Sequence, residues 1–272
     1  MTYLTEEERE RRKKENESHI FYSSFNFLRG HYGIRPKELH LLLGTSGSGK
    51  STLARSIITD CARDKKVLLW ASEEPAYSLE YAFNNITRDE RTLKNISIYS
   101  EITMPTAIRE QGAYSFMEFF REKVMSYFPD IIFIDNITTS YMYSERIGLS
   151  GQEIVAAEIS KFIDKNKIPI FVIAHTKKGI VDNQDKLIDT TDIRGNSAIA
   201  NAAGYAYVLQ NFRVNNTMYP FIHLRKHRYH SVTEKYYQLQ YEDGKYYKDR
   251  VIDFNLINEI YKLRNRLKGK YE

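Results

Sequence analysis

The sequence GTSGSGKST, residues 44–52, follows the apolar run LHLLL at residues 39–43 and predicts a phosphate-binding loop. It fits the pattern G-x-x-x-x-G-K-[ST], in which glycines let backbone N–H groups curl around phosphate oxygens. A strand before the loop and a helix beginning at Lys50 are the context that such a loop requires. We expect Lys50 to reach the β- and γ-phosphates of ATP, and the Ser51 hydroxyl to bind Mg²⁺. The expected nucleotide contacts are Gly44, Thr45, Ser46, Gly47, Ser48, Gly49, Lys50, Ser51 and Thr52.

Two further segments place carboxylates at the ends of apolar strands. IIFIDN, residues 131–136, brings Asp135 to a strand end, where it would hold the magnesium-bound water; its other interpretation is an N-cap. LLWASEEP, residues 68–75, carries two adjacent glutamates after the apolar strand. We expect Glu73 to polarise the water that attacks the γ-phosphate, with Glu74 as the alternative, because spacing alone does not separate them.

Apolar strands and helices alternate between residues 39 and 175. Continuous apolar strands separated by helices indicate an α/β fold with a mostly parallel central sheet flanked by helices. After residue 200, three closely spaced strand patterns predict C-terminal antiparallel strands. The expected strands are 39–43, 66–71, 96–100, 130–137, 168–175, 202–212, 219–227 and 235–242, and the expected helices are 50–61, 76–86, 113–128 and 150–166.

The pattern divides the chain into three parts. Residues 1–34 form a charged N-terminal helix and a lead-in segment, residues 35–250 the core, and residues 251–272 a basic amphipathic helix. The net charge of +5 comes from the C-terminal end, since residues 225–272 hold 12 Lys and Arg against 7 Asp and Glu. An anionic partner such as nucleic acid and a solvated basic tail both explain that excess.

Composition argues for a cytoplasmic protein without a membrane partner. The sequence has no run of 18 apolar residues, and its charged N-terminus does not look like a secretory signal. The single cysteine, Cys61, cannot form an intrachain disulfide, which suits a reducing compartment.

The glutamate after the second strand resembles that of the RecA-like phosphate-loop ATPases, which include RecA, RadA, KaiC and the replicative helicase DnaB. Three later segments, residues 151–179, 192–210 and 221–231, resemble successive motifs of the DnaB ATPase domain. The sequence AHTKKG around His175 is nearer to RadA and to RepA-type plasmid helicases. The resemblance covers roughly residues 35–242 and implies a RecA-like fold.

The resemblance also implies an active site shared between subunits. In the family, the two basic residues that correspond to Lys226 and Arg228 reach the γ-phosphate of the neighbouring subunit. A surface strand with solvent-facing basic residues is the other interpretation. His175 would act as a γ-phosphate sensor, or else be a packed core histidine. Family members use a helix before the core to dock on a neighbour, so Tyr3 and Leu4 are the expected anchors of the N-terminal helix.

The function implied by the resemblance is an ATP-dependent DNA helicase or translocase. It would work as a homo-oligomeric ring, a hexamer, on single-stranded DNA, together with other replication or recombination proteins. The polar segment 177–194 would line the channel with four cationic groups. It also holds four aspartates and no aromatic residue, which keeps two alternatives open: a RadA- or KaiC-like ATPase that acts on protein partners, and a recombinase-type filament. The expected nucleic-acid contacts are Lys177, Lys178, Lys186 and Arg194.

Overall fold

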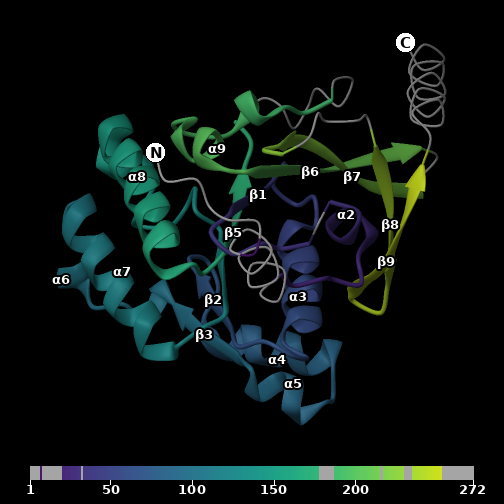
Figure 1. Ribbon diagram of the computed structural model, residues 1–272, viewed down its shortest axis with the longest axis horizontal. Helices are drawn as coiled ribbons and strands as arrows, with labels where there is room; N and C mark the ends of the chain where they lie inside the picture. The colour runs from purple at the N-terminus through teal and green to yellow at the C-terminus, as the bar shows by residue number, and fades with distance from the viewer. Residues whose placement is uncertain are drawn as a thin grey trace.

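The structure, a computed structural model, describes residues 7, 20–31, 33–177, 187–214, 217–229 and 235–252. These residues form a nine-stranded sheet in the order β3-β2-β4-β5-β1-β6-β7-β8-β9. Helices lie on both sides of the central strands (Figure 1). The predicted α/β class, with a mostly parallel sheet and C-terminal antiparallel strands, is confirmed.

The parallel part of the sheet brings the ends of its strands to one edge. Its register pairs Gly44 with His175 and Ala71 with Asp135. Open α/β sheets bind ligands at the carboxyl ends of their strands. The sheet therefore gathers the motifs of four segments that are far apart in the sequence. The parallel strands are β1 (Leu39–Gly44), β2 (Val67–Ala71), β3 (Ile96–Ser100), β4 (Ile131–Asp135), β5 (Ile170–His175) and β6 (Tyr205–Val214).

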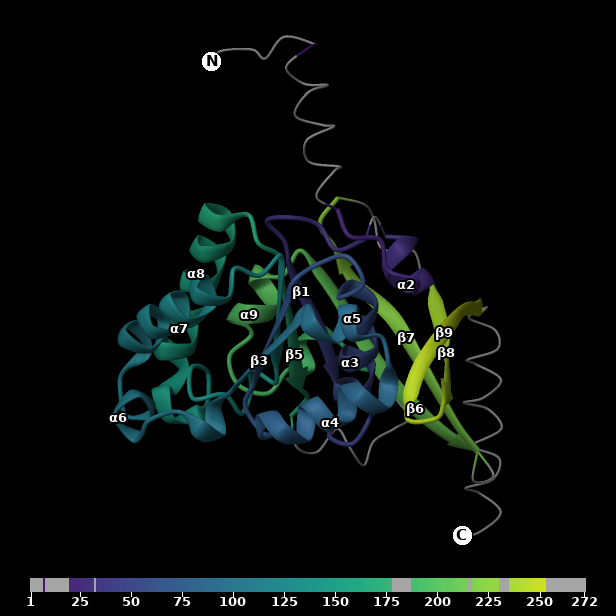
Figure 2. The same ribbon diagram turned by 90° about the horizontal axis from the view of Figure 1, so that it is seen from below.

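Both faces of the central strands are buried under helices, as Figure 2 shows from a second direction. Leu41 and Leu43 belong to the apolar cluster on the side of α7 (Ala113–Tyr127), α8 (Gly148–Asn166) and α9 (Ala198–Ala202). Leu42 belongs to the cluster on the side of α3 (Lys50–Cys61) and α4 (Ala76–Ile86). Burial on both faces is the reason that these strands are apolar at every position instead of every second one.

Short helical segments make most of the remaining connections. They are α2 (Asn26–Arg29), α5 (Glu90–Lys94), α6 (Thr106–Arg109), η1 (Glu101–Thr103), η2 (Glu145–Ile147) and η3 (Thr190–Asp192). Within the described part of the chain, none of the helices is both long enough and apolar enough to cross a bilayer.

The antiparallel part consists of β6 and three further strands, β7 (Thr217–His227), β8 (Tyr236–Glu242) and β9 (Lys245–Ile252). The sequence pattern does not predict β9, and the expected core boundary at residue 250 falls two residues before the end of this strand. The strand lies at the edge of the sheet, and only two of its residues, Tyr246 and Asp249, are buried. Its sequence, KYYKDRVI, therefore lacks the apolar run that identifies the central strands.

The β9 strand ties the beginning of the described chain to the phosphate loop. The buried Asp249 carboxylate accepts hydrogen bonds from the backbone N–H groups of Asn26 at 2.6 Å and Phe27 at 2.7 Å. Tyr246 packs against the loop so closely that a Cβ at Gly49 would lie 2.6 Å from its hydroxyl oxygen. The lead-in segment therefore packs into the same core, with Phe25, Phe27 and Leu28 buried beside α3.

Two sequence predictions fall on parts of the chain that are not described. The N-terminal helix with Tyr3 and Leu4, and the C-terminal helix from residue 253 onward, lie outside the described residues.

A buried carboxylate connects β2 to the segment after β4. Glu101 has no exposed surface and accepts hydrogen bonds from the Trp70 indole at 2.6 Å, the Ser140 hydroxyl at 2.5 Å and the Tyr141 backbone N–H at 2.9 Å. Burial raises the pKa of Glu101, and the three donors oppose that shift. The carboxylate thereby fixes the chain that follows Asp135.

A buried histidine lies in the middle of the sheet. The ring of His40 stacks on Tyr205 with centroids 4.6 Å apart and on Phe171 with centroids 5.6 Å apart. Neither of its ring nitrogens has a hydrogen-bond partner among the described residues. Burial, with a smaller contribution from His227, lowers the pKa of His40 to about 3, so the ring is neutral at physiological pH.

Candidate active site

The phosphate loop has the backbone shape that its glycines predict. Gly47 and Gly49 have φ angles of 74° and 93°, a region that residues with a Cβ rarely occupy. A Cβ at Gly44 would lie 2.6 Å from the Leu209 carbonyl oxygen, so β6 supports the start of the loop. The loop leads directly into α3, whose first residue is Lys50. The positive end of this helix therefore faces the concavity of the loop.

Lys50 is held inside the loop. Only 3% of the residue is exposed, and its Nζ donates a hydrogen bond to the Thr45 carbonyl oxygen at 2.6 Å. Burial lowers the pKa of Lys50 to about 8, although the carboxylates of Asp135 and Glu73 oppose this shift. A buried cation with one backbone acceptor is well suited to a phosphate anion.

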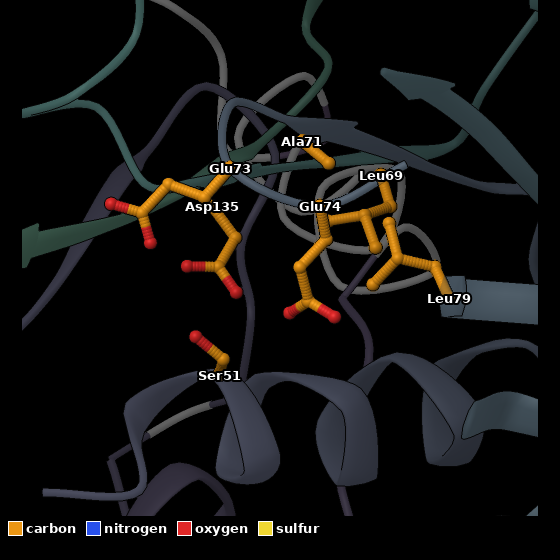
Figure 3. Close-up of a pocket in the computed structure, with 7 residues that line it drawn as sticks. All are labelled: Ser51, Leu69, Ala71, Glu73, Glu74, Leu79 and Asp135. Atoms are coloured by element: carbon orange, nitrogen blue, oxygen red, sulfur yellow. The ribbon is translucent and has the colours of Figure 1, made fainter. Parts of the chain in front are cut away.

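Asp135 and Ser51 form the candidate metal site. The Ser51 hydroxyl points toward the Asp135 carboxylate across a pocket at the end of β2 and β4 (Figure 3). Burial raises the pKa of Asp135 to about 6, while the hydrogen bond from Ser51 and the charges of Arg55 and Lys50 lower it. A carboxylate and a hydroxyl are hard oxygen ligands of the kind that Mg²⁺ prefers.

The two glutamates after β2 have different surroundings, which spacing alone could not reveal. Glu74 forms an ion pair with Arg55 of α3 at 2.9 Å. Glu73 points away from Glu74 in Figure 3, and its carboxylate lies 3.8 Å from the Nε2 of His175. Its side chain is 51% exposed, so water can reach it. Of the two, Glu73 is the more exposed carboxylate, and Glu74 is the one that Arg55 binds directly.

His175, at the end of β5, is held by the segment that follows Asp135. Its Nε2 lies 2.8 Å from the Asn136 Nδ2, and its backbone N–H donates to the Thr138 hydroxyl at 3.3 Å. Burial and the nearby charge of Lys50 lower the pKa of His175 to about 4, so the ring is neutral. His175 is therefore part of the polar site and not solely a packed core residue.

Lys226 and Arg228 lie far from the phosphate loop of their own chain. The Arg228 N–H donates to Gly204, whose own N–H donates to Leu39 at the beginning of β1. The loop follows the other end of this strand, about 17 Å away at a rise of about 3.3 Å per residue. The Lys226 Nζ donates to the carbonyls of Ala200 and Asn201 at 3.0 and 2.7 Å.

The Arg228 guanidinium is half exposed. Its Nη1 lies 3.4 Å from the buried Glu38 carboxylate, and its side chain is 48% exposed. The Tyr229 hydroxyl also donates to Glu38, at 2.5 Å. Its Nη2 also donates to the Ala202 carbonyl oxygen at 3.3 Å, so Arg228 has two partners in its own chain and a surface that remains accessible.

Two of the four predicted nucleic-acid contacts lie in the described part of the chain. Arg194 forms an ion pair with the exposed Glu145 at 2.8 Å. The Lys177 Nζ donates to the Thr191 carbonyl oxygen at 3.0 Å. Lys178 and Lys186 lie outside the described residues. These contacts hold both side chains against their own chain.

The residues of the loop fit a nucleotide with a divalent cation. The Ser48 hydroxyl and the Thr176 hydroxyl are buried, and neither has a hydrogen-bond partner among the described residues. Buried polar groups normally find partners, and phosphate oxygens are suitable ones here. The carboxylate of Asp135, with its raised pKa, is correspondingly suited to a cation. Fold and site together define a phosphate-loop nucleoside triphosphatase of the RecA-like class.

The comparison with protein families identifies the family. The profile of the KaiC ATPase family matches residues 23–245, which is most of the chain. The chain belongs to the KaiC family of ATPases. The structure is also similar to that of a KaiC-like protein from the archaeon Pyrococcus horikoshii OT3, with a TM-score of 0.63 at 15% identity. That similarity covers 86% of this chain and 99% of the archaeal one, and it supports the fold alone.

Curated relatives include bacterial proteins named DNA repair protein RadA. The protein from Aquifex aeolicus is 25% identical over 178 residues, which are 63% of this chain and 36% of the relative. Those from Streptococcus pneumoniae and Streptococcus pyogenes are 28% and 30% identical, over 54% and 58% of this chain and 32% of each relative. The chain thus spans about a third of the length of these relatives. These similarities favour the RadA- or KaiC-like alternative over a DnaB-type helicase.

Three residues of the site are not predicted from the sequence. Asn136 holds His175, Arg55 holds Glu74, and Tyr246 packs on the loop. The asparagine was part of the quoted IIFIDN motif, so its position next to Asp135 was an available signal. Arg55 and Tyr246 belong to no motif, and only the fold places them at the site.

Proposed function

We propose that this protein is an ATP hydrolase that works as an oligomer of the RadA and KaiC type, with active sites at the contacts between subunits. The observation that carries the proposal is the convergence of Lys50, Ser51, Asp135 and Glu73 at the carboxyl edge of one sheet. The phosphate loop binds the phosphates, and Lys50 offsets their charge. Mg²⁺, when bound by Ser51 and Asp135, neutralises charge on the β- and γ-phosphates.

In this proposal Glu73 orients and polarises the attacking water. Its exposed carboxylate and the absence of an Arg55-like partner in the described structure leave it available for that role. His175 lies between Glu73 and Asn136 of the segment after β4, where it would respond to the γ-phosphate. Lys226 and Arg228 would complete the site of a neighbouring subunit, since they lie at the other end of β1 from their own loop.

A contact between opposite ends of two subunits is head-to-tail, so it generates a ring or a filament. A hexameric ring and a filament are both compatible with this geometry. The proposed partners are further copies of the chain, and either proteins or single-stranded DNA. The RadA name of the curated relatives supports DNA, whereas the four aspartates and the lack of an aromatic residue in segment 177–194 support a protein partner.

The decisive experiment measures Mg²⁺-dependent release of phosphate from ATP at several protein concentrations, together with sedimentation velocity. The proposal predicts that turnover per subunit rises with the oligomeric fraction. Hydrolysis at a constant rate per subunit in a monomeric sample would contradict the shared site. Addition of single-stranded DNA then separates the two partner classes, because only a DNA-dependent enzyme is stimulated.

A further inference from the structure

The side-chain amide of Asn136 has a fixed orientation. Its Oδ1 accepts hydrogen bonds from the Thr139 backbone N–H at 2.9 Å and from the Thr138 hydroxyl at 2.7 Å. A backbone N–H can only donate, so the atom that faces it must be the amide oxygen. The amide nitrogen therefore points at His175, and the 2.8 Å contact between Asn136 Nδ2 and His175 Nε2 is a hydrogen bond that Asn136 donates.

This direction determines where the imidazole carries its proton. A neutral histidine has one donor nitrogen and one acceptor nitrogen. Since Nε2 accepts from Asn136, the proton lies on Nδ1. A protonated Nε2 would instead face the Glu73 carboxylate, which lies 3.8 Å away, and could pair with it. The two arrangements are mutually exclusive, because Nε2 cannot accept from Asn136 and donate to Glu73 at once.

We infer that Asn136 is a positioning residue that keeps His175 in the Nδ1–H form and thereby prevents His175 from pairing with Glu73. Only the expected effect on ATP turnover rests on the proposed function; the position of the His175 proton does not depend on it. With Nε2 occupied by Asn136, the Glu73 carboxylate keeps its lone pairs for a water molecule. Thr138 and Thr139 hold the amide, so the segment that carries Asp135 also sets the state of the histidine on the next strand.

The test is long-range ¹H–¹⁵N NMR of the full chain with ¹⁵N-labelled histidine, assigned with the variant His175→Gln. In the wild type, the Nδ1 of His175 should be the protonated nitrogen. Asn136→Asp replaces the donor by an acceptor, so the proton should move to Nε2. Asn136→Ser, which removes the donor without adding charge, should give a mixture of the two forms. Thr139→Val is the control, since it removes one hydroxyl donor to Asn136 and keeps the backbone N–H that orients the amide.

ATP turnover supplies a second readout on the same samples. Asn136→Asp should lower kcat by about 10²-fold, the lower end of what a general base contributes, and leave KM within about 2-fold. A wild-type His175 imidazole that is protonated on Nε2 would overturn the inference. An unchanged position of the His175 proton in Asn136→Asp would do the same. A proton that moves as expected in a protein whose wild type hydrolyses no ATP would support the positioning role and overturn the proposed function.

Discussion

The Glu74 carboxylate accepts a hydrogen bond from the Arg55 guanidinium at 2.9 Å, and this pair joins the end of β2 to the helix that follows the phosphate loop. Glu74 is therefore a structural link, and Glu73 beside it is the candidate base. Glu73→Gln should lower ATP turnover by about 10²- to 10⁴-fold while nucleotide binding persists, because the amide cannot take a proton from water.

The matched control for this prediction is Glu74→Gln, whose amide oxygen can still accept from Arg55. It should keep most of the turnover, and stability should change by no more than about 1 kcal/mol because the pair is partly exposed. Turnover is measured by phosphate release and binding by a fluorescent nucleotide. A larger loss in Glu74→Gln than in Glu73→Gln would reverse the assignment.

Lys50→Ala should abolish hydrolysis and weaken nucleotide binding. The substitution removes the buried cation that lies at the floor of the loop, and loss of one preorganised donor typically costs about 10²- to 10³-fold in kcat. Calorimetry gives the affinity, and circular dichroism shows whether the fold survives the truncation. A well-folded Lys50→Ala protein with normal turnover would remove the basis of the proposed function.

Mixing two inactive proteins tests the role of Arg228. Arg228→Gln removes the positive charge but keeps a donor for Glu38, and it should bind ATP through its own intact loop. An arginine finger is worth about 10³- to 10⁵-fold in rate, so this variant alone should hydrolyse ATP poorly. When it is mixed with Lys50→Ala, some sites combine an intact loop with an intact Arg228, and part of the activity should return.

The control for Arg228 is Tyr229→Phe, which removes a second partner of Glu38 and leaves the guanidinium in place. This variant should keep its turnover. No recovery in mixed oligomers, once subunit exchange is shown by fluorescence energy transfer, would indicate that Arg228 acts within its own chain or that all sites are strictly coupled. Full activity of Arg228→Gln alone would leave Arg228 as a residue that only supports Glu38.

Protonation of the buried His40 should make the folded protein less stable in acid. Its pKa is about 3 in the folded chain against 6.5 in the unfolded one, so the unfolded chain binds the proton first. The contribution of neutral His40 to the free energy of unfolding is complete above pH 6.5. It is lost as the pH falls toward 3, at about 1.4 kcal/mol per pH unit. His40→Phe keeps the stacking and removes the titration. Urea unfolding at pH 7.5 and pH 5 should show a smaller decrease for His40→Phe than for the wild type; equal decreases would contradict the prediction.

Glu101→Gln should destabilise the protein by about 1 to 3 kcal/mol, because an amide nitrogen cannot accept the hydrogen bonds that a carboxylate oxygen accepts. Trp70 is the only tryptophan and donates to Glu101, so its emission reports the change directly. Glu118→Gln, on the exposed face of α7, is the matched control and should alter neither the emission nor the unfolding midpoint. An unchanged midpoint in Glu101→Gln would show that the carboxylate is dispensable.

Most of the fold could be predicted because its central strands are apolar at every position. The helix expected at residues 50–61 has those bounds in the structure, since a glycine-rich turn and a long amphipathic pattern define it. The β9 strand was missed because an exposed edge strand needs only a few inward residues, here Tyr246 and Asp249. These two residues are three positions apart, because the pairing with β8 shifts register between them, so the period-2 pattern that identifies a strand is absent from this segment.

Residues of the candidate site could be predicted only where one short segment of the sequence contains both the reactive side chains and their characteristic spacing. The phosphate loop and Asp135 are of this kind, because their spacing and their strand ends are visible in the sequence. The choice between Glu73 and Glu74 depended on Arg55, which lies one helical turn into α3 and reaches Glu74 through space. Such partners depend on how α3 packs against β2, and a local sequence pattern does not show how two separate segments pack.

The packing of β9 against the phosphate loop has a consequence for synthesis on the ribosome. Asn26 and Asp249 bond across 223 residues, and Tyr246 reaches Gly49 from the same late strand. The loop leaves the exit tunnel long before the strand that supports it, and contacts of such separation form slowly. A nascent chain halted before residue 245 should therefore carry the complete loop sequence and still fail to retain nucleotide, so that ligand capture waits for translation to pass β9.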